Sequence, residues 1–299
     1  MPQKCLLKTS NIMTTSSGAG VHRPGHATRS NTELLTALRE NIRGVDGEGS
    51  TTAKVVLDEV VGEEVLRVPF YDSPPVGLQE EREEYDVTVK LFHLPTTAPV
   101  HQPAYTSAAI SAVLRELSTP RIDLLIIAFP GITFDADDLP PTPAPEPIVD
   151  PATAPAPTAE IAALLPSYNV LESLHQTGVI SRLGISEFGT SRLESLLPFT
   201  TVKPSVDQIN VRDCCVVPKP LIVYAKEKGI ELLTHNDCAE VIDGREVEKL
   251  FREEGVEGWG EAEDGKKVVP LWVAKYTAVV RSRGVVENKG YIAMVEILP

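Results

Sequence analysis

The apolar positions of the chain recur with two periods, one typical of helices and one typical of buried strands. Leu34, Leu38 and Ile42 recur every four residues within residues 30–44, which is the spacing of one helix face, and Ser30 and Glu33 form a capping box at the start of this helix. Residues 122–129 form a continuous apolar run, as expected for a strand covered on both faces of a parallel sheet. The same patterns repeat: strands are predicted at residues 86–94, 182–186, 205–211 and 230–235, and helices at residues 104–117, 160–176, 191–197, 219–228 and 246–254.

This alternation of strands and helices predicts an α/β fold with a parallel sheet and right-handed crossovers. Residues 272–281 are expected to add a helix end and a further strand. About seven or eight such units in a chain of this length favour a (β/α)8 TIM-type barrel over an open sheet. Neither a GxGxxG motif after the first strand nor a Walker motif is present, which weakens the two main open-sheet nucleotide-binding folds.

Two segments stand apart from this rhythm. Residues 1–30 are basic and rich in Ser and Thr, with Gly and Pro interruptions and no clear amphipathic period, and we expect a flexible segment in preference to an organelle presequence. Residues 139–158 hold eight of the 25 prolines and almost no large apolar side chain, so they predict a disordered, polyproline-like insertion. Residues 31–299 are then expected to form a single barrel with this one interruption.

Composition limits the classes of partner and compartment. The net charge of −14 opposes binding to a nucleic-acid backbone, and ten acidic residues between Leu57 and Asp86 supply more than half of it. No apolar run approaches the roughly 20 residues that a membrane helix needs. Four cysteines in 299 residues do not make a disulfide framework, so the sequence predicts a reducing, cytoplasmic location.

Three segments resemble the barrel strands of aldo-keto reductases. These are IDLLIIAFP at residues 122–130, GVISRLGISEF at residues 178–188 and PSVDQINV at residues 204–211. Lys90 also resembles the reductase lysine at the end of the third strand. The order and spacing of these segments agree with that family.

Two longer stretches resemble a more specific family. Residues 202–237 contain a QxNxxxCC run and the sequence LLTHND, and residues 269–291 end in SRG-x4-KGY. Both are similar to the regulatory (modifier, light-chain) subunits of glutamate–cysteine ligase, which are relatives of the aldo-keto reductases. The resemblance implies a non-catalytic subunit that binds the ligase's catalytic subunit as a heterodimer. It also implies that this binding raises glutamate affinity and relieves feedback inhibition by glutathione in glutathione biosynthesis.

The reductase resemblance implies a catalytic tetrad of Tyr, Lys, Asp and His that is incomplete here. The His position falls on Ala128, whose methyl group neither donates nor accepts a proton. The segment that usually carries the Tyr and Asp has no counterpart between residues 44 and 85, and Tyr71 lies in an unsuitable context. Lys90 is retained, so Lys90 and Ala128 are interpreted as vestiges of a catalytic site.

The same resemblance maps a partial cofactor site. The positions that hold the nicotinamide amide correspond to Ser186, Glu187 and Gln208, and Glu187 replaces an amide with a carboxylate. The phosphate-binding segment corresponds to Arg281, Ser282 and Arg283, which retain positive charge. The role implied by the resemblance requires no cofactor, and these residues leave residual NADPH binding open. No spaced ligand set for a metal is present.

Two further groups are candidates for partner contact or redox chemistry. Cys214 and Cys215 are adjacent, and either could bridge to another chain, although two reduced and partly buried thiols are the plainer interpretation. His235, Asn236 and Asp237 follow a predicted strand at the end where barrels place functional loops, and a polar pair capping the next helix is the alternative. An NADPH-dependent oxidoreductase with a rearranged acid and a redox-responsive scaffold remain alternative functions.

Overall fold

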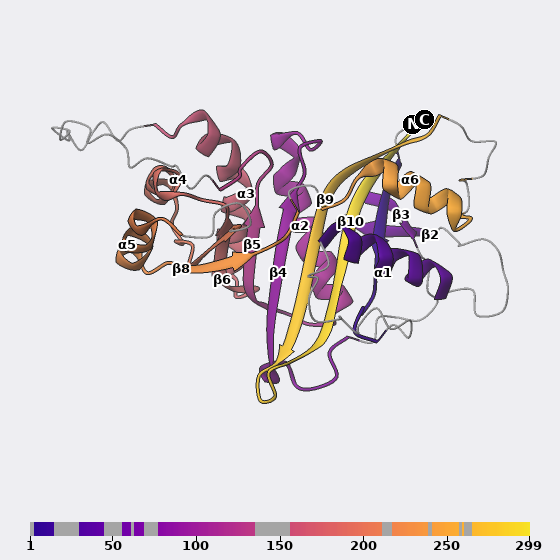
Figure 1. Cartoon of the computed structure of the whole chain (residues 1–299), viewed down its shortest axis with the longest axis horizontal. Coiled ribbons are helices and arrows are strands. Elements are labelled where there is room, and N and C mark those ends of the chain that lie inside the picture. Colours follow the sequence, from indigo (N-terminus) through magenta and orange to yellow (C-terminus); the bar gives the residue numbers. More distant parts are fainter. Residues whose placement is uncertain are drawn as a thin grey trace.

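The computed structural model describes residues 3–14, 30–44, 56–60, 63–68, 77–134, 156–210, 217–238, 241–256, 259 and 265–299. These residues form a sheet with the strand order β2-β3-β1-β10-β9-β4-β5-β6-β7-β8, and helices cover it (Figure 1). Most of the proline-rich segment lies outside the described residues, as do residues 61–62 and 69–76 of the acidic segment, Tyr71, Cys214 and Cys215.

One half of the sheet is parallel, and its elements agree with those predicted from the apolar pattern. The strands are β4 (Tyr85–His93), β5 (Ile122–Ala128), β6 (Ile180–Ser186), β7 (Val206–Asn210) and β8 (Glu231–His235). The helices between them are α2 (Gln102–Glu116), α3 (Ala159–Gln176), α4 (Thr190–Leu196) and α5 (Lys219–Lys228), with short 3-10 turns at Arg82–Glu84, Pro99–His101 and Leu197–Phe199. Each strand pairs in parallel with the next one along the chain, which requires a crossover connection between them.

The other half is mainly antiparallel, and the sequence predicted only a strand within residues 272–281 of it. Residues 272–281 were expected to include a helix end, but they belong to strand β9 (Lys267–Val280), which pairs with β10 (Val285–Leu298) as a long hairpin. Alternate positions over much of β9 are buried, which is the period of a strand with one face on the core. Gly290 of the KGY motif lies in this hairpin, where a Cβ atom would overlap the Ser10 carbonyl oxygen and the Tyr276 hydroxyl.

The beginning of the chain is also part of this half, which corrects the expected flexible segment for residues 3–8. Strand β1 (Gln3–Lys8) pairs antiparallel with β10 and parallel with β3 (Glu63–Val68), which in turn pairs with β2 (Val56–Val60). Cys5, Leu6 and Leu7 are at most 1% exposed, so burial of this short apolar run fixes the segment.

The α/β class is confirmed, and strands β4 to β8 have the order and helical connections of a barrel wall. Within the described residues the sheet stays open between its edge strands β2 and β8, because β9 pairs with β4 and not with β8. The carboxyl ends of β4 to β8 therefore meet at one edge of the sheet, as they do in a barrel.

Two large apolar clusters stabilise the two halves of the described sheet, and a third, small cluster contains Leu124, Ile126 and Val206. One cluster lies between the sheet and helices α2 to α5. The second packs α1 (Ser30–Gly44) and α6 (Gly244–Glu253) on β1, β9 and β10 (Figure 1). The predicted stripe of Leu34, Leu38 and Ile42 is at most 2% exposed, and its burial contributes about 1.5–3 kcal/mol per side chain.

Thr158, the last residue of the predicted insertion, caps α3, because its Oγ1 accepts a hydrogen bond from the Ile161 N–H at 3.3 Å.

Across the described residues, no helix combines the length and the apolar character needed to cross a bilayer.

Candidate functional site

The parallel strands place most of the sequence-predicted site residues on one face of the sheet. Lys90 is in register with Ile126 of β5, and Ser186 of β6 is in register with Gln208 of β7. His235 ends β8 in register with Asn210. Because side chains alternate between faces, the register puts Lys90, Ala128, Ser186, Gln208 and His235 on the same face, near the carboxyl ends of their strands. The predicted vestigial catalytic positions therefore share one location.

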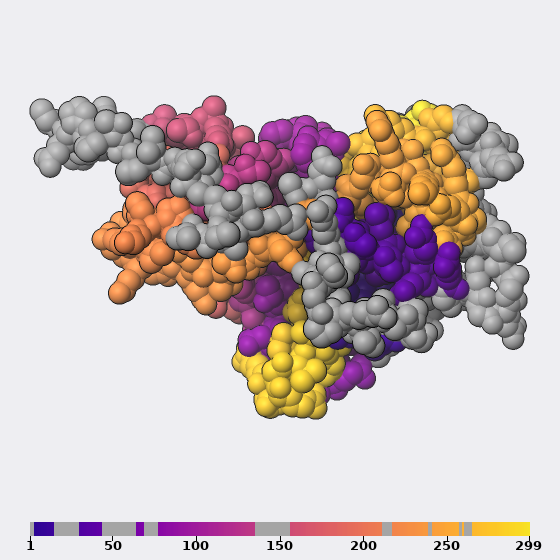
Figure 2. All heavy atoms as spheres, in the orientation of Figure 1, coloured from indigo at the N-terminus to yellow at the C-terminus, as the bar shows by residue number. Residues whose placement is uncertain are grey.

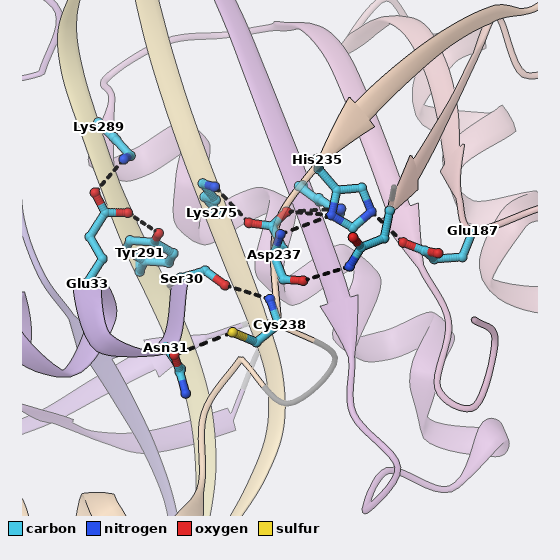
Figure 3. Close-up of polar contacts among 12 residues, drawn as sticks. Ser30, Asn31, Glu33, Glu187, His235, Asp237, Cys238, Lys275, Lys289 and Tyr291 are labelled. Atoms are coloured by element: carbon cyan, nitrogen blue, oxygen red, sulfur yellow. Dashed lines mark hydrogen bonds and ion pairs between the residues drawn. The ribbon is translucent and has the colours of Figure 1, made fainter. Parts of the chain in front are cut away.

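The centre of this location is the Asp237 carboxylate, just after β8 (Figure 3). Its Oδ2 accepts a hydrogen bond from Lys90 Nζ at 3.0 Å, and its Oδ1 accepts one from Lys275 Nζ at 2.9 Å. Lys90 and Asp237 are each 5% exposed at the side chain, whereas Lys275 is 25% exposed. The single Asp237 carboxylate thus bridges two ammonium groups in a largely buried position.

These contacts and burial determine the pKa values of Asp237 and Lys90. Burial raises the pKa of the Asp237 carboxyl, but the charges of Lys90 and Lys275 outweigh it and lower the pKa to about 2. Burial lowers the pKa of Lys90, and the nearby Asp237 charge opposes that change. An ionised carboxylate between two ammonium groups is the stable arrangement at neutral pH.

His235 extends the cluster toward β6. Its Nδ1 accepts a hydrogen bond from the Asp237 backbone N–H at 3.1 Å, and its Nε2 contacts the Glu187 carboxylate. A ring nitrogen that accepts from an amide carries no proton, so the neutral ring has its proton on Nε2 and donates it to Glu187. Asn236, between the two cluster residues, is exposed, and Asn210 donates from Nδ2 to the Asp237 carbonyl at 3.3 Å.

Glu187 has a backbone conformation that is unusual for its type, with φ at +70°. Its Oε2 accepts a hydrogen bond from the Phe134 N–H at 2.8 Å, and its own N–H donates to the Gln208 carbonyl at 3.0 Å. Burial raises the pKa of the Glu187 carboxyl, but the hydrogen bonds from His235 and the Phe134 N–H and the nearby Lys90 charge outweigh burial, so the net shift is downward. The turn after β6 therefore directs a carboxylate at His235, where the reductase resemblance implies an amide donor.

A second polar group joins the same loop to helix α1 (Figure 3). The Cys238 N–H donates to Ser30 Oγ at 3.0 Å, and Cys238 Sγ donates to Asn31 Oδ1 at 3.4 Å. One turn further along α1, Glu33 accepts hydrogen bonds from Lys289 and Tyr291 of β10. Residues 237–238 are thereby held between the sheet and α1.

Sequence reasoning missed Lys275, Glu33 as a site residue, and Tyr291. Lys90, Lys275 and Tyr291 are consecutive register partners across β4, β9 and β10, so they form one row of polar side chains. This row depends on the antiparallel hairpin, which has no local signal in the apolar spacing. The sequence signal for Glu33 was its place in the capping box, which indicates a helix start and not a site.

The expected phosphate-binding residues do not join this cluster. Arg281 lies at the beginning of β4, where its N–H donates to the Glu84 carbonyl and its guanidinium contacts Asp86 and Asp123 at 2.8 and 3.4 Å. Arg283 pairs with Glu80 and Glu287, and Ser282 is in the same turn. These residues are at the opposite end of the sheet from Ser186 and Gln208.

The described residues therefore do not assemble the dinucleotide site that the resemblance implied. The amide-binding and phosphate-binding halves are separated by the length of β4, both arginines are engaged by carboxylates, and Glu187 adds negative charge. Among the described side chains, no three His, Cys, Asp or Glu residues gather into a group that could hold a metal ion.

Comparison with known proteins assigns the family. A model of the aldo/keto reductase family matches residues 61–257, which span the whole parallel half together with β3 and α6. The chain belongs to the aldo/keto reductase family, in agreement with the predicted barrel-type class.

Within it, the chain is a member of the glutamate–cysteine ligase regulatory subunits. It is 32% identical to the Mus musculus and Homo sapiens glutamate–cysteine ligase regulatory subunits over 213 residues, covering 71% of this chain and 67% of each relative. A putative glutamate–cysteine ligase regulatory subunit of Schizosaccharomyces pombe is 27% identical over 282 residues, covering 88% of this chain and 87% of that protein.

Proposed function

We propose that the chain is a non-catalytic subunit that binds the catalytic subunit of glutamate–cysteine ligase and raises its activity in glutathione synthesis. The observation that carries this proposal is the 32% identity to relatives named as regulatory subunits of that ligase, over two thirds of their length. The proposal includes higher affinity of the catalytic subunit for glutamate, weaker feedback inhibition by glutathione, and action in the cytoplasm as a heterodimer.

Such regulation is a coupling free energy between two binding events. The chain must bind the active conformation of the catalytic subunit better than the inhibited one, since an effector with equal affinity for both states shifts nothing. A fold inherited from reductases suits this role, because its strands stay packed while its surface acquires a partner.

The polar cluster supports a role without turnover. A reductase needs a general acid that is free to protonate a developing alkoxide. Here Ala128 stands at the histidine position, the Lys90 ammonium donates a hydrogen bond to Asp237, and the Tyr291 hydroxyl donates a hydrogen bond to Glu33. We propose that these groups now hold the loop after β8 in place and that the regulatory role needs no cofactor.

The test uses the full chain and a purified catalytic subunit. The two proteins are mixed and separated by size exclusion, and initial rates are measured over a range of glutamate with and without glutathione. The proposal predicts co-elution, a lower KM for glutamate and a higher glutathione concentration for half inhibition. Separate elution together with unchanged kinetics would overturn it.

An NADPH-dependent reductase is the second candidate, favoured by the shared face of Lys90, Ser186 and Gln208. Fluorescence titration with NADPH, followed by assay of a panel of aldehydes, separates the two. Saturable NADPH binding together with aldehyde turnover would favour the reductase. Failure to bind NADPH and to turn over any aldehyde would favour the regulatory role.

A further inference from the structure

Helix α5 presents an unusual surface at the end of the parallel half. Ile222 and Val223 are 46% and 56% exposed, although most side chains of this size are covered in the described residues. Lys219 and Lys226, also exposed, lie three residues before Ile222 and three residues after Val223. Positions i, i+3, i+4 and i+7 share one face of a helix, so these four side chains form a single stripe, called here the α5 stripe.

The stripe has no partner within the described chain. The opposite face of α5 is packed, because Leu221 and Ala225 are each 1% exposed in the main apolar cluster. The neighbours of α5 are α4 and β8, and β8 is the edge strand of the described sheet. Figure 2 shows α5 (orange) on the outer surface at one extremity of the molecule.

Other exposed large apolar side chains in the described residues do not form such a group. Met13 follows β1, Val100 is in a 3-10 turn, and Val285 begins β10 at the hairpin turn. Isolated exposed apolar residues are normal on protein surfaces, whereas adjacent ones with charged residues around them mark interaction sites. The pair on α5 is therefore the described apolar feature that most resembles the centre of an interface.

The positive charge around the α5 stripe favours an acidic partner. The chain as a whole carries a net charge of −14, but α5 has Lys219, Lys226 and Lys228 against Glu227. Lys228 lies over the Tyr224 ring, with its Nζ 5.3 Å from the ring centroid. An apolar centre between two lysines is complementary to a segment with apolar side chains flanked by carboxylates.

We infer that the α5 stripe is a docking surface for an acidic, apolar-faced segment of the ligase's catalytic subunit. This inference rests on the proposed function, since it names the surface by which that function is exerted. The apolar pair supplies most of the affinity, and the lysines supply orientation and the dependence on salt.

The experiment measures the affinity of the full chain for the purified catalytic subunit by biolayer interferometry at several salt concentrations. The double variant Ile222→Glu/Val223→Glu places charge on the stripe with a residue that favours helices, so α5 is retained. Lys219→Glu/Lys226→Glu reverses the flanking charges. Val285→Glu is the matched control, because it charges an exposed apolar side chain at the distant hairpin turn.

The inference predicts a loss of affinity of about tenfold or more for the apolar double variant and severalfold for the lysine variant, with a shallower salt dependence. The control should stay within about twofold of the unmodified chain. Circular dichroism and the thermal midpoint confirm that each variant is folded.

Three results would overturn the inference, and they are distinguishable. If the unmodified chain binds the catalytic subunit and the stripe variants bind equally well, the docking surface is wrong and the proposed function stands. If the stripe variants change only the self-association of the chain, the stripe is covered by a second copy. If the unmodified chain does not bind at all, the proposed function fails as well.

Discussion

Lys90 and Lys275 face each other as direct register partners on strands β4 and β9, and the two oxygens of Asp237 each accept a hydrogen bond from one of them. Like charges opposite one another in a sheet destabilise it. The carboxylate that relieves this repulsion comes from neither strand but from the loop after β8. Asp237 therefore connects the loop after the edge strand β8 to β4 and β9, the two strands at which the parallel and antiparallel halves meet.

Replacing Asp237 tests this relationship. Asp237→Asn leaves two ammonium groups without their counter-ion, one of them almost fully buried, and we expect a loss of about 3–5 kcal/mol in the free energy of unfolding. Denaturant unfolding followed by circular dichroism measures it. Asp86→Asn is the control, because Asp86 is 60% exposed in its pair with Arg281 and should change stability by less than about 1 kcal/mol. Equal effects of the two substitutions would contradict the account.

The pH dependence of stability follows from the same carboxylate. The Asp237 pKa is about 2 in the folded chain against an ordinary 3.8, so the ionised form stabilises the fold above about pH 4. That contribution, about 2 kcal/mol, is lost as the pH falls from about 4 to about 2. The difference in unfolding free energy between the unmodified chain and Asp237→Asn should shrink over this interval. A difference that stays constant with pH would mean that Asp237 does not titrate as described.

When the ring of His235 is neutral, it should hold a single tautomer. The Asp237 N–H donates to Nδ1, and Glu187 accepts at Nε2, so the proton belongs on Nε2. Two-bond proton–nitrogen correlation spectra of the neutral ring identify the tautomer directly. Glu187→Leu should broaden or shift the Nε2–H signal, whereas Glu231→Gln, on the exposed beginning of β8, should leave it unchanged. A proton found on Nδ1 would contradict the geometry.

The parallel half could be predicted from sequence because its signals are local. The apolar run of β5, the helical spacing of residues 104–117 and the alternation from β6 to β8 each indicate an element without reference to distant residues. The strand pattern also placed His235 at the end of the sheet where barrels carry functional loops, whereas Lys90, Ser186 and Gln208 were assigned from the resemblance to the reductases.

The β9–β10 hairpin and the contacts around Asp237 could not be predicted, because they depend on pairing between distant parts of the chain. Strand β9 pairs with β4 although the register partners Lys90 and Lys275 are 185 positions apart in the chain, and the contact between Lys90 and Asp237 spans 147 positions. Sequence period alone cannot show which strand a hairpin joins. The placement of Arg281 and Arg283 failed for this reason: their motif was matched to a phosphate site, but the hairpin carries them to the opposite end of β4.

If the chain tightens glutamate binding, glutamate must tighten the complex by the same factor, because coupling between two ligands is reciprocal. The affinity of the chain for the catalytic subunit should therefore be higher in saturating glutamate than in its absence. Calorimetric titration under both conditions measures the factor, and aspartate at the same concentration controls for ionic strength. Equal affinities would exclude regulation through glutamate binding.

The most direct test of the regulatory role is the rate of the catalytic subunit at low glutamate and inhibitory glutathione, measured as the chain is added to excess. The account predicts a saturable rise in rate that reaches its plateau near one chain per catalytic subunit, and no reaction from the chain alone. A rate that stays constant at every ratio would contradict it.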